Sequence, residues 1–126
     1  MKENRIKVLK VEPLKKPTVC YLENKLEVLQ EAVSIGAEYV GLIEIIDLNK
    51  CSCVLCNGEG KLIGLMPNRR LGDDIICGVF YITGQNDEDD LTSLTDEQIE
   101  YYSKMFADAE YFIPSERGKI IVLKFI

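Results

Sequence analysis

The sequence contains no histidine. Histidine is the usual general base near neutral pH, a frequent metal ligand, and the side chain that activates catalytic serine and cysteine. Its absence excludes every Ser-His and Cys-His catalytic pair. The sequence also has no recognisable catalytic motif of another kind, so we expect a protein that is not an enzyme and that has no catalytic residues.

Long apolar runs are also missing. The longest one interrupted by a single charge extends from Tyr39 to Ile46, whereas a membrane-spanning helix needs about 20 apolar residues. The N-terminal segment MKENRIKVLKVEP has neither the apolar stretch nor the small-residue cleavage site of a signal peptide. We therefore expect a soluble, cytoplasmic protein without a membrane partner.

The five cysteines are an odd number in a chain without an export signal, so they predict reduced thiols rather than a disulfide framework. Cys51, Cys53, Cys56 and Cys77 could be drawn as a four-thiolate zinc site. On a strand, however, Cys51 and Cys53 share one face while Cys56 points to the other. Cysteine is also common as a small buried hydrophobe, so we expect no metal and no cofactor.

The net charge of −6 is unevenly distributed. Residues 1–25 contain seven basic and three acidic side chains, or +4, which leaves −10 for the remainder. The segment from Asp87 to Glu110 has nine acids and one base. Nucleic-acid-binding proteins neutralise phosphates with clustered lysine and arginine, so we expect no direct nucleic-acid binding. The acid-rich segment is either a solvated surface or a nucleic-acid mimic.

Alternating apolar residues, helical spacing and turn residues together predict the order β-β-α-β-β-β-β-α-β. Asn24 is expected to cap the first helix, which Gly36 ends, and Thr95 with Gln98 forms a capping box for the second. Asn57-Gly58-Glu59-Gly60 is expected to be a hairpin turn, and residues 67–74 a polar connection. The expected strands are Ile6–Glu12, Thr18–Glu23, Tyr39–Leu48, Cys51–Cys56, Lys61–Met66, Ile75–Thr83 and Lys119–Phe125.

The 126 residues fit a single domain. The element order predicts an α+β fold, with a mainly antiparallel sheet of about six or seven strands and two helices packed on it.

One polar group stands among apolar strand residues. Glu44 shares its predicted strand face with Val40, Leu42 and Ile46, where an unpaired buried carboxylate would be costly. Arg69 or Arg70, after a neighbouring strand, could pair with it, and Asn68, Asp73 and Asp74 are close in sequence. This cluster is either a binding site or a structural salt bridge; a third alternative is an edge strand with Glu44 facing water.

Six segments together resemble domain-of-unknown-function family 3846, over about residues 6–106. They are VLKVEP, LEVLQEAV, IEII, VLCNGEGKLIGL, PNRRLGDDIICGVFYI and SLTDEQIEYYSKMF. The most specific stretch runs from Cys56 to Gly78 and contains Asn57, Gly60-Lys61-Leu62, Asn68-Arg69 and Asp74-Ile75-Ile76. Gly58 replaces a usually acidic residue, three of the cysteines (Cys51, Cys53 and Cys77) are outside the pattern, and residues 107–126 form a C-terminal extension. Members of that family occur in bacteriophages, conjugative elements and gut Firmicutes, and the resemblance implies no activity.

The residues and the resemblance together suggest an accessory protein of a phage or mobile element that binds a host protein or a small ligand. An arginine fork and an asparagine amide are chemically suited to a nucleotide-like ligand. The second hypothesis is an acidic decoy that occupies a host DNA-acting enzyme. The third is an enzyme that uses Glu44 or Asp74 as acid or base. The candidate binding residues are Glu44, Asn57, Asn68, Arg69 and Asp74.

Overall fold

The computed structural model describes residues 4–116, 118 and 120–125. It confirms the predicted α+β class, with two helices and a mainly antiparallel sheet. The helices are α1 (Leu26–Ala32) and α2 (Asp96–Met105). The strands are β1 (Arg5–Val11), β2 (Thr18–Glu23), β3 (Ile43–Asn49), β4 (Ser52–Asn57), β5 (Pro67–Leu71), β6 (Asp74–Cys77), β7 (Phe80–Gln85), β8 (Leu91–Thr92), β9 (Ala109–Pro114) and β10 (Ile120–Phe125).

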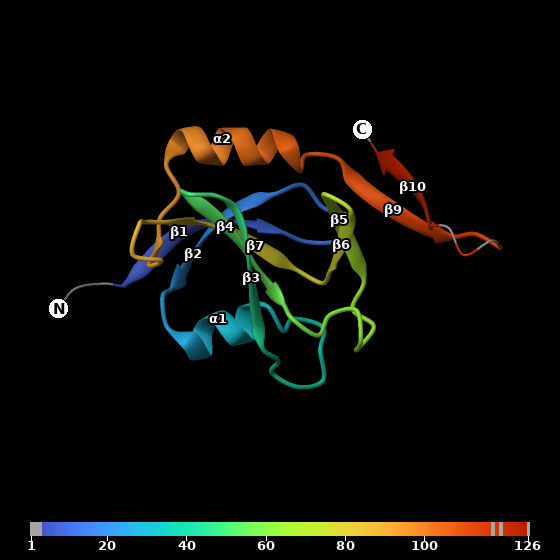
Figure 1. Cartoon of the computed structure of the whole chain (residues 1–126), viewed down its shortest axis with the longest axis horizontal. Coiled ribbons are helices and arrows are strands. Elements are labelled where there is room, and N and C mark those ends of the chain that lie inside the picture. Colours follow the sequence, from blue (N-terminus) through green and yellow to red (C-terminus); the bar gives the residue numbers. More distant parts are fainter. Residues whose placement is uncertain (1–3, 117, 119, 126) are drawn as a thin grey trace.

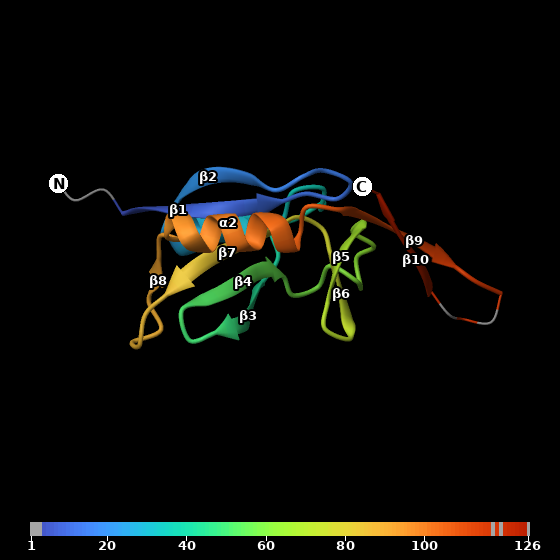
Figure 2. The same cartoon turned by 90° about the horizontal axis from the view of Figure 1, so that it is seen from above.

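The main sheet has six strands in the order β2-β1-β7-β4-β3, and β8 pairs with the end of β7. All of its pairings are antiparallel. Figure 2 shows the same order, with β2 at one side of the sheet and β3 at the other. The two long edges of the sheet are therefore β2 and β3.

The two helices cover opposite faces of this sheet, α2 on one and α1 on the other (Figure 1). The central strands must therefore be apolar on both faces, and every residue of β4 is buried. Along β7, Phe80 and Ile82 belong to the cluster under α2, whereas Tyr81, together with Val79 just before the strand, belongs to the cluster under α1.

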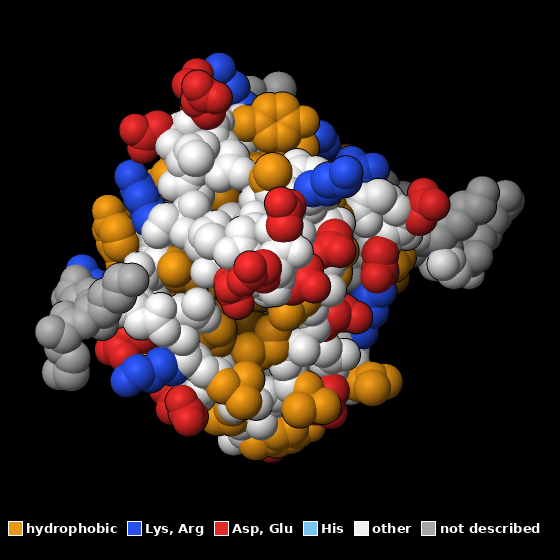
Figure 3. All heavy atoms as spheres, turned by 60° about the vertical axis from the view of Figure 1, so that its left-hand side comes forward, with side chains coloured by type: hydrophobic (Ala, Val, Ile, Leu, Met, Phe, Trp, Pro, Cys, Tyr) orange, Lys and Arg blue, Asp and Glu red, His pale blue; other side chains and the backbone are white. Residues whose placement is uncertain are grey.

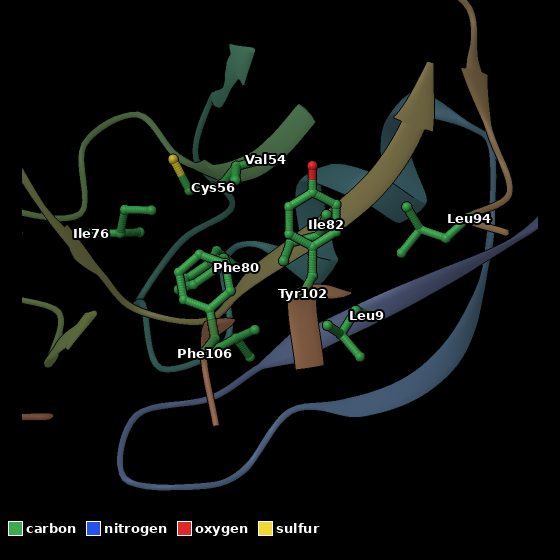
Figure 4. Packing of buried hydrophobic residues seen from close by; sticks show 10 residues of the cluster. Leu9, Val54, Cys56, Ile76, Phe80, Ile82, Leu94, Tyr102 and Phe106 are labelled. Atoms are coloured by element: carbon green, nitrogen blue, oxygen red, sulfur yellow. The ribbon is translucent and has the colours of Figure 1, made fainter. Parts of the chain in front are cut away.

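The core under α2 is built around two aromatic rings from that helix, Tyr102 and Phe106 (Figure 4). The Phe106 ring meets the Phe80 ring edge to face, with 5.3 Å between the centroids, a geometry that the ring quadrupoles favour. Tyr102 places its hydroxyl against Ser52 Oγ and accepts a hydrogen bond from Asn49 Nδ2 at 3.1 Å. These contacts fix α2 on the β3–β4 hairpin.

The second predicted helix start is confirmed and the first is wrong. Thr95 Oγ1 accepts from Gln98 N–H while Gln98 Oε1 accepts from Thr95 N–H, which completes the capping box. The N-cap of α1 is Lys25, without a side-chain capping bond. Asn24 instead donates from Nδ2 to Leu91 O at 3.5 Å.

The segment 58–66 departs from its predicted form. Lys61–Met66 is not a strand but a series of turns, in which Ile63 N–H donates to Glu59 O and Leu65 N–H to Gly60 O. Leu62 is 86% exposed. Gly64, within these turns, has a φ of +75°, which glycine adopts without strain.

The predicted polar connection 67–74 is wrong as well, because most of it forms the hairpin β5–β6 with its turn at Gly72 and Asp73. The predicted strand Ile75–Thr83 is divided at Gly78, whose φ is +87°. β6 therefore pairs with β5, and only β7 enters the main sheet.

Beyond residue 107, β9 and β10 form a separate antiparallel hairpin that extends to one side of the fold (Figure 1). The predicted final strand Lys119–Phe125 corresponds to β10, and Lys119 lies outside the described residues. In the part of the chain that the structure describes, neither helix has the length and hydrophobicity to cross a membrane.

Candidate functional site

A cleft of about 320 Å³ opens between the ends of β3 and β4, the turn 58–62 and β6. Its volume is at the lower end of the range typical of small-molecule sites. Apolar side chains from β3, β4 and β6 form part of its lining, and three charged side chains border it. The charged residues are Glu44, Lys61 and Asp74, and the apolar ones include Ile46, Cys56 and Ile76.

Lys61 and Asp74 form an ion pair at the cleft. Asp74 Oδ1 also accepts the backbone N–H of Ile75 at 2.8 Å. The hydrogen bond from Lys61, followed by that from Ile75, lowers the pKa of Asp74 below its usual value of 3.8. Both side chains are more than half exposed, so the pair adds little to stability. It positions one positive and one negative charge beside the cleft.

Glu44 and Cys56 are directly opposite each other on β3 and β4. The thiol of Cys56 contacts Glu44 Oε1 at a distance of 3.7 Å. Burial, and then the charge of Glu44, raise the pKa of Cys56 to about 12. The thiol is therefore protonated at neutral pH and is not an activated nucleophile.

A general base near neutral pH needs a raised carboxyl pKa. The lowered pKa of Asp74 is the opposite shift, and this argues against the expected alternative of Asp74 as an acid–base catalyst.

Asn57 borders the cleft, but its side chain is used within the fold. Its Oδ1 accepts the N–H of Glu59 at 2.8 Å and so shapes the turn. Its Nδ2 lies against Gly41, where an added Cβ would be 2.9 Å away. Among the described residues, Asn57 Nδ2 is the one buried side-chain polar atom without a hydrogen-bond partner.

Asn68 and Arg69 are buried, which corrects the expectation that they meet Glu44. Asn68 donates from Nδ2 to Val11 O at 2.8 Å and to Gly78 O at 2.9 Å. Arg69 is 1% exposed. It donates to Asn68 Oδ1, Lys15 O and Phe106 O. These bonds occupy the guanidinium with the side-chain oxygen of Asn68 and the backbone carbonyls of Lys15 and Phe106, so Arg69 is structural and offers no fork to a ligand.

Arg70, the other expected partner of Glu44, binds Glu110 instead. Glu110 accepts from Arg70 N at 2.7 Å and from Arg70 Nη2 at 3.0 Å. Burial raises the pKa of Glu110, but the hydrogen bonds and charge of Arg70 outweigh this and leave the pKa below its usual value of 4.5. This pair attaches β9 to β5.

The acidic segment from Asp87 to Glu110 is partly neutralised. Asp96 pairs with Lys7, Glu100 with Lys104, and Glu110 with Arg70. Figure 3 shows acidic side chains gathered near the middle of one face of the molecule. The exposed acids of the β7–β8 connection are Asp87, Glu88, Asp89 and Asp90. Three of the nine acids thus pair with a basic side chain of the same chain, and two of these three, Asp96 and Glu100, remain mostly exposed.

The family model described as "Domain of unknown function (DUF3846)" matches residues 6–107. The chain belongs to this family. No curated protein and no solved structure gives a significant match. Within the DUF3846 match, the stretch from Cys56 to Gly78 both borders the cleft and, through Asn68, holds the β5–β6 hairpin against β1. The hairpin β9–β10 lies beyond the matched residues.

Three of the five predicted candidates, Glu44, Asn57 and Asp74, therefore border one cleft, whereas Asn68 and Arg69 lie in the interior. Sequence reasoning missed Lys61 as a site residue because it placed this lysine on a strand. The available signal was its position in the same family-like stretch as Asp74, thirteen residues away.

Proposed function

We propose that the protein is a non-enzymatic, cytoplasmic binding protein of a phage or mobile element, and that the cleft is its binding site for a host protein or small ligand. The observation that carries this proposal is the set of charges at the cleft. Glu44 and Asp74 contribute two carboxylates, and Lys61 contributes one ammonium group that pairs with Asp74. None of the ion pairs found among the described residues involves Glu44.

These charges favour a cationic group over a phosphate. The expected nucleotide-like ligand depended on the arginine fork of Arg69, which is bonded to backbone carbonyls. An amine or guanidinium entering the cleft would instead meet the carboxylate of Glu44, which is exposed on the edge strand β3 and can accept charge-assisted hydrogen bonds. The small volume suits a single side chain or a small amine.

The proposal is tested by NMR titration of the ¹⁵N-labelled protein with methylguanidinium, and with inorganic phosphate as the probe of opposite charge. We expect methylguanidinium to shift the amide signals of residues 58–62 and 74–77, and phosphate to leave them unchanged. Glu44→Gln should remove the shifts. Glu27→Gln, which removes an exposed carboxylate from α1, should retain them. Unchanged signals with methylguanidinium, or equal shifts in both variants, would reject the cleft as the binding site.

A further inference from the structure

The cleft adjoins an open edge of the main sheet. β3 pairs with β4 on one side and is the last strand of the sheet on the other. Figure 2 shows β3 on the outside of the sheet, away from β1 and β2. An edge strand presents backbone N–H and C=O groups that another extended chain can bind.

The register of β3 identifies which residues present these groups. Gly58 N–H donates to Leu42 O at 2.8 Å, immediately before the paired residues Ile43 and Asn57. Bonded and non-bonded pairs alternate in an antiparallel ladder. Glu44 and Ile46 therefore bond to β4, whereas Ile43, Ile45 and Asp47 direct their backbone groups to the open edge.

The open edge has few of the features that normally prevent strand addition. β3 contains neither proline nor lysine, the residues with which proteins commonly protect an edge. Ile45 is 56% exposed. A register irregularity between Asp47 and Asn49 ends the regular ladder, so the accessible edge extends from Ile43 to Asp47.

The side chains of Glu44 and Ile46 line the cleft. In a sheet, residues opposite each other project from the same face. In an added antiparallel strand, the residue opposite Glu44 would therefore project toward the cleft, and the residue opposite Ile45 would project to the other face. The carboxylate of Glu44 would be within reach of a basic side chain at the first of these positions.

We propose that β3 binds an extended segment of a partner protein as an added antiparallel strand, with a lysine or arginine of that segment facing Glu44. The inference rests on the proposed function and names its partner class. In this mode of recognition the main chain supplies affinity, while the pockets beside alternate side chains supply specificity. The opposite edge, β2, is not among the elements that line the cleft, so β3 is the edge that combines open backbone groups with an acidic site.

The test uses a short capped peptide that alternates valine and threonine around one arginine, measured by the same NMR titration. Strand addition predicts shifts along residues 43–47 as well as in the cleft. Replacement of the arginine by glutamate should weaken binding at least about tenfold, because it places like charges together.

Two N-methylated peptides separate strand addition from simple capture of the arginine. The residue opposite Ile45 uses its own N–H to bond β3, whereas the N–H of the arginine opposite Glu44 points away. N-methylation of the residue opposite Ile45, which directly precedes the arginine in the peptide, should abolish binding. N-methylation of the arginine itself should be tolerated. These peptides leave the protein unchanged, so folding defects do not affect the comparison.

A protein variant provides an independent readout. Ile45→Pro removes an N–H that points to the open edge and removes no hydrogen bond to β4. Edge strands tolerate proline at positions of this kind. Ile45→Pro should abolish peptide binding, while Tyr21→Pro on the opposite edge should not. Equal binding of both N-methylated peptides, together with methylguanidinium shifts in the cleft, would overturn strand addition and leave the cleft proposal intact. Absence of both peptide and methylguanidinium binding would overturn the two proposals together.

Discussion

Arg69 donates two hydrogen bonds to the carbonyl oxygen of Phe106, from Nε at 3.3 Å and from Nη2 at 3.1 Å. Phe106 is the C-cap of α2, and carbonyl groups at a helix end lack partners within the helix. A positive charge there also interacts favourably with the negative end of the helix dipole. A guanidinium from the β5–β6 hairpin thus completes the end of α2 and joins two parts of the fold.

Replacement of Arg69 should therefore affect stability before it affects any ligand. Arg69→Ala leaves buried carbonyl groups unpaired, so we expect a loss of roughly 2–4 kcal/mol in the free energy of unfolding. Arg69→Lys should recover only part of the stability that Arg69→Ala loses, since an ammonium group lacks the planar fork of a guanidinium. Urea denaturation measures both, with the exposed Lys16→Ala as control. Unchanged stability together with lost ligand binding would make Arg69 a ligand residue after all.

Gly60 is expected to be intolerant of any side chain. A Cβ at this position would lie 2.7 Å from the backbone oxygen of Cys77, and a backbone atom cannot move aside at low cost. Gly60→Ala should destabilise the fold by roughly 1–3 kcal/mol, as measured by thermal denaturation. Gly58→Ala is the matched control, because the nearest atom to its Cβ would be 3.5 Å away. Equal effects of the two substitutions would contradict this packing.

Stability should fall in acid partly through Glu110. Its pKa in the folded state is lower than 4.5, so the ionised form favours folding. This contribution is fully present above pH 4.5 and is lost as the pH falls through the folded-state pKa. Glu110→Gln should show a smaller loss of stability below pH 4.5 when urea unfolding is followed against pH. If the free energy of unfolding fell with pH equally steeply in both proteins, the charge of Glu110 would not contribute to stability through its pair with Arg70.

The two helix starts should respond oppositely to substitution. Thr95→Ala removes the capping box of α2 and should lower the free energy of unfolding by about 1 kcal/mol. Lys25→Ser should raise it by a few tenths to about 1 kcal/mol, because Lys25 is an extended N-cap without a side-chain bond. Thermal denaturation of the two variants measures both effects, and a destabilised Lys25→Ser protein would contradict the assigned N-cap.

The thiols should differ in reactivity. Cys51 is exposed, whereas Cys56 is buried and its pKa is raised to about 12. Brief treatment of the folded protein with iodoacetamide near pH 8 should label Cys51 and spare Cys56, because the thiolate is the reacting form. Peptide mass analysis identifies the labelled residues, and the urea-unfolded protein is the control in which both react. Early labelling of Cys56 in the folded protein would contradict its burial.

The sequence alone predicted features that depend on residues close to one another along the chain. The capping box at Thr95 and the apolar pattern of the central strands are of this kind, since a few adjacent side chains determine them. Local pattern failed at residues 61–66, where a run of apolar residues suggested a strand. The compact turns there follow from contacts with β6, including the close approach of Gly60 to Cys77.

The sequence by itself thus determined the α+β class, the two helices and the outlying position of Glu44 among apolar neighbours. Only the tertiary structure decided which charges meet. Arg69 bonds to Phe106 and Lys15, which are 37 and 54 residues away along the chain, and Lys61, not Arg69, stands beside Asp74. A charged side chain pairs with whichever segments packing brings next to it. The separation of two residues along the chain does not give their distance in the folded structure.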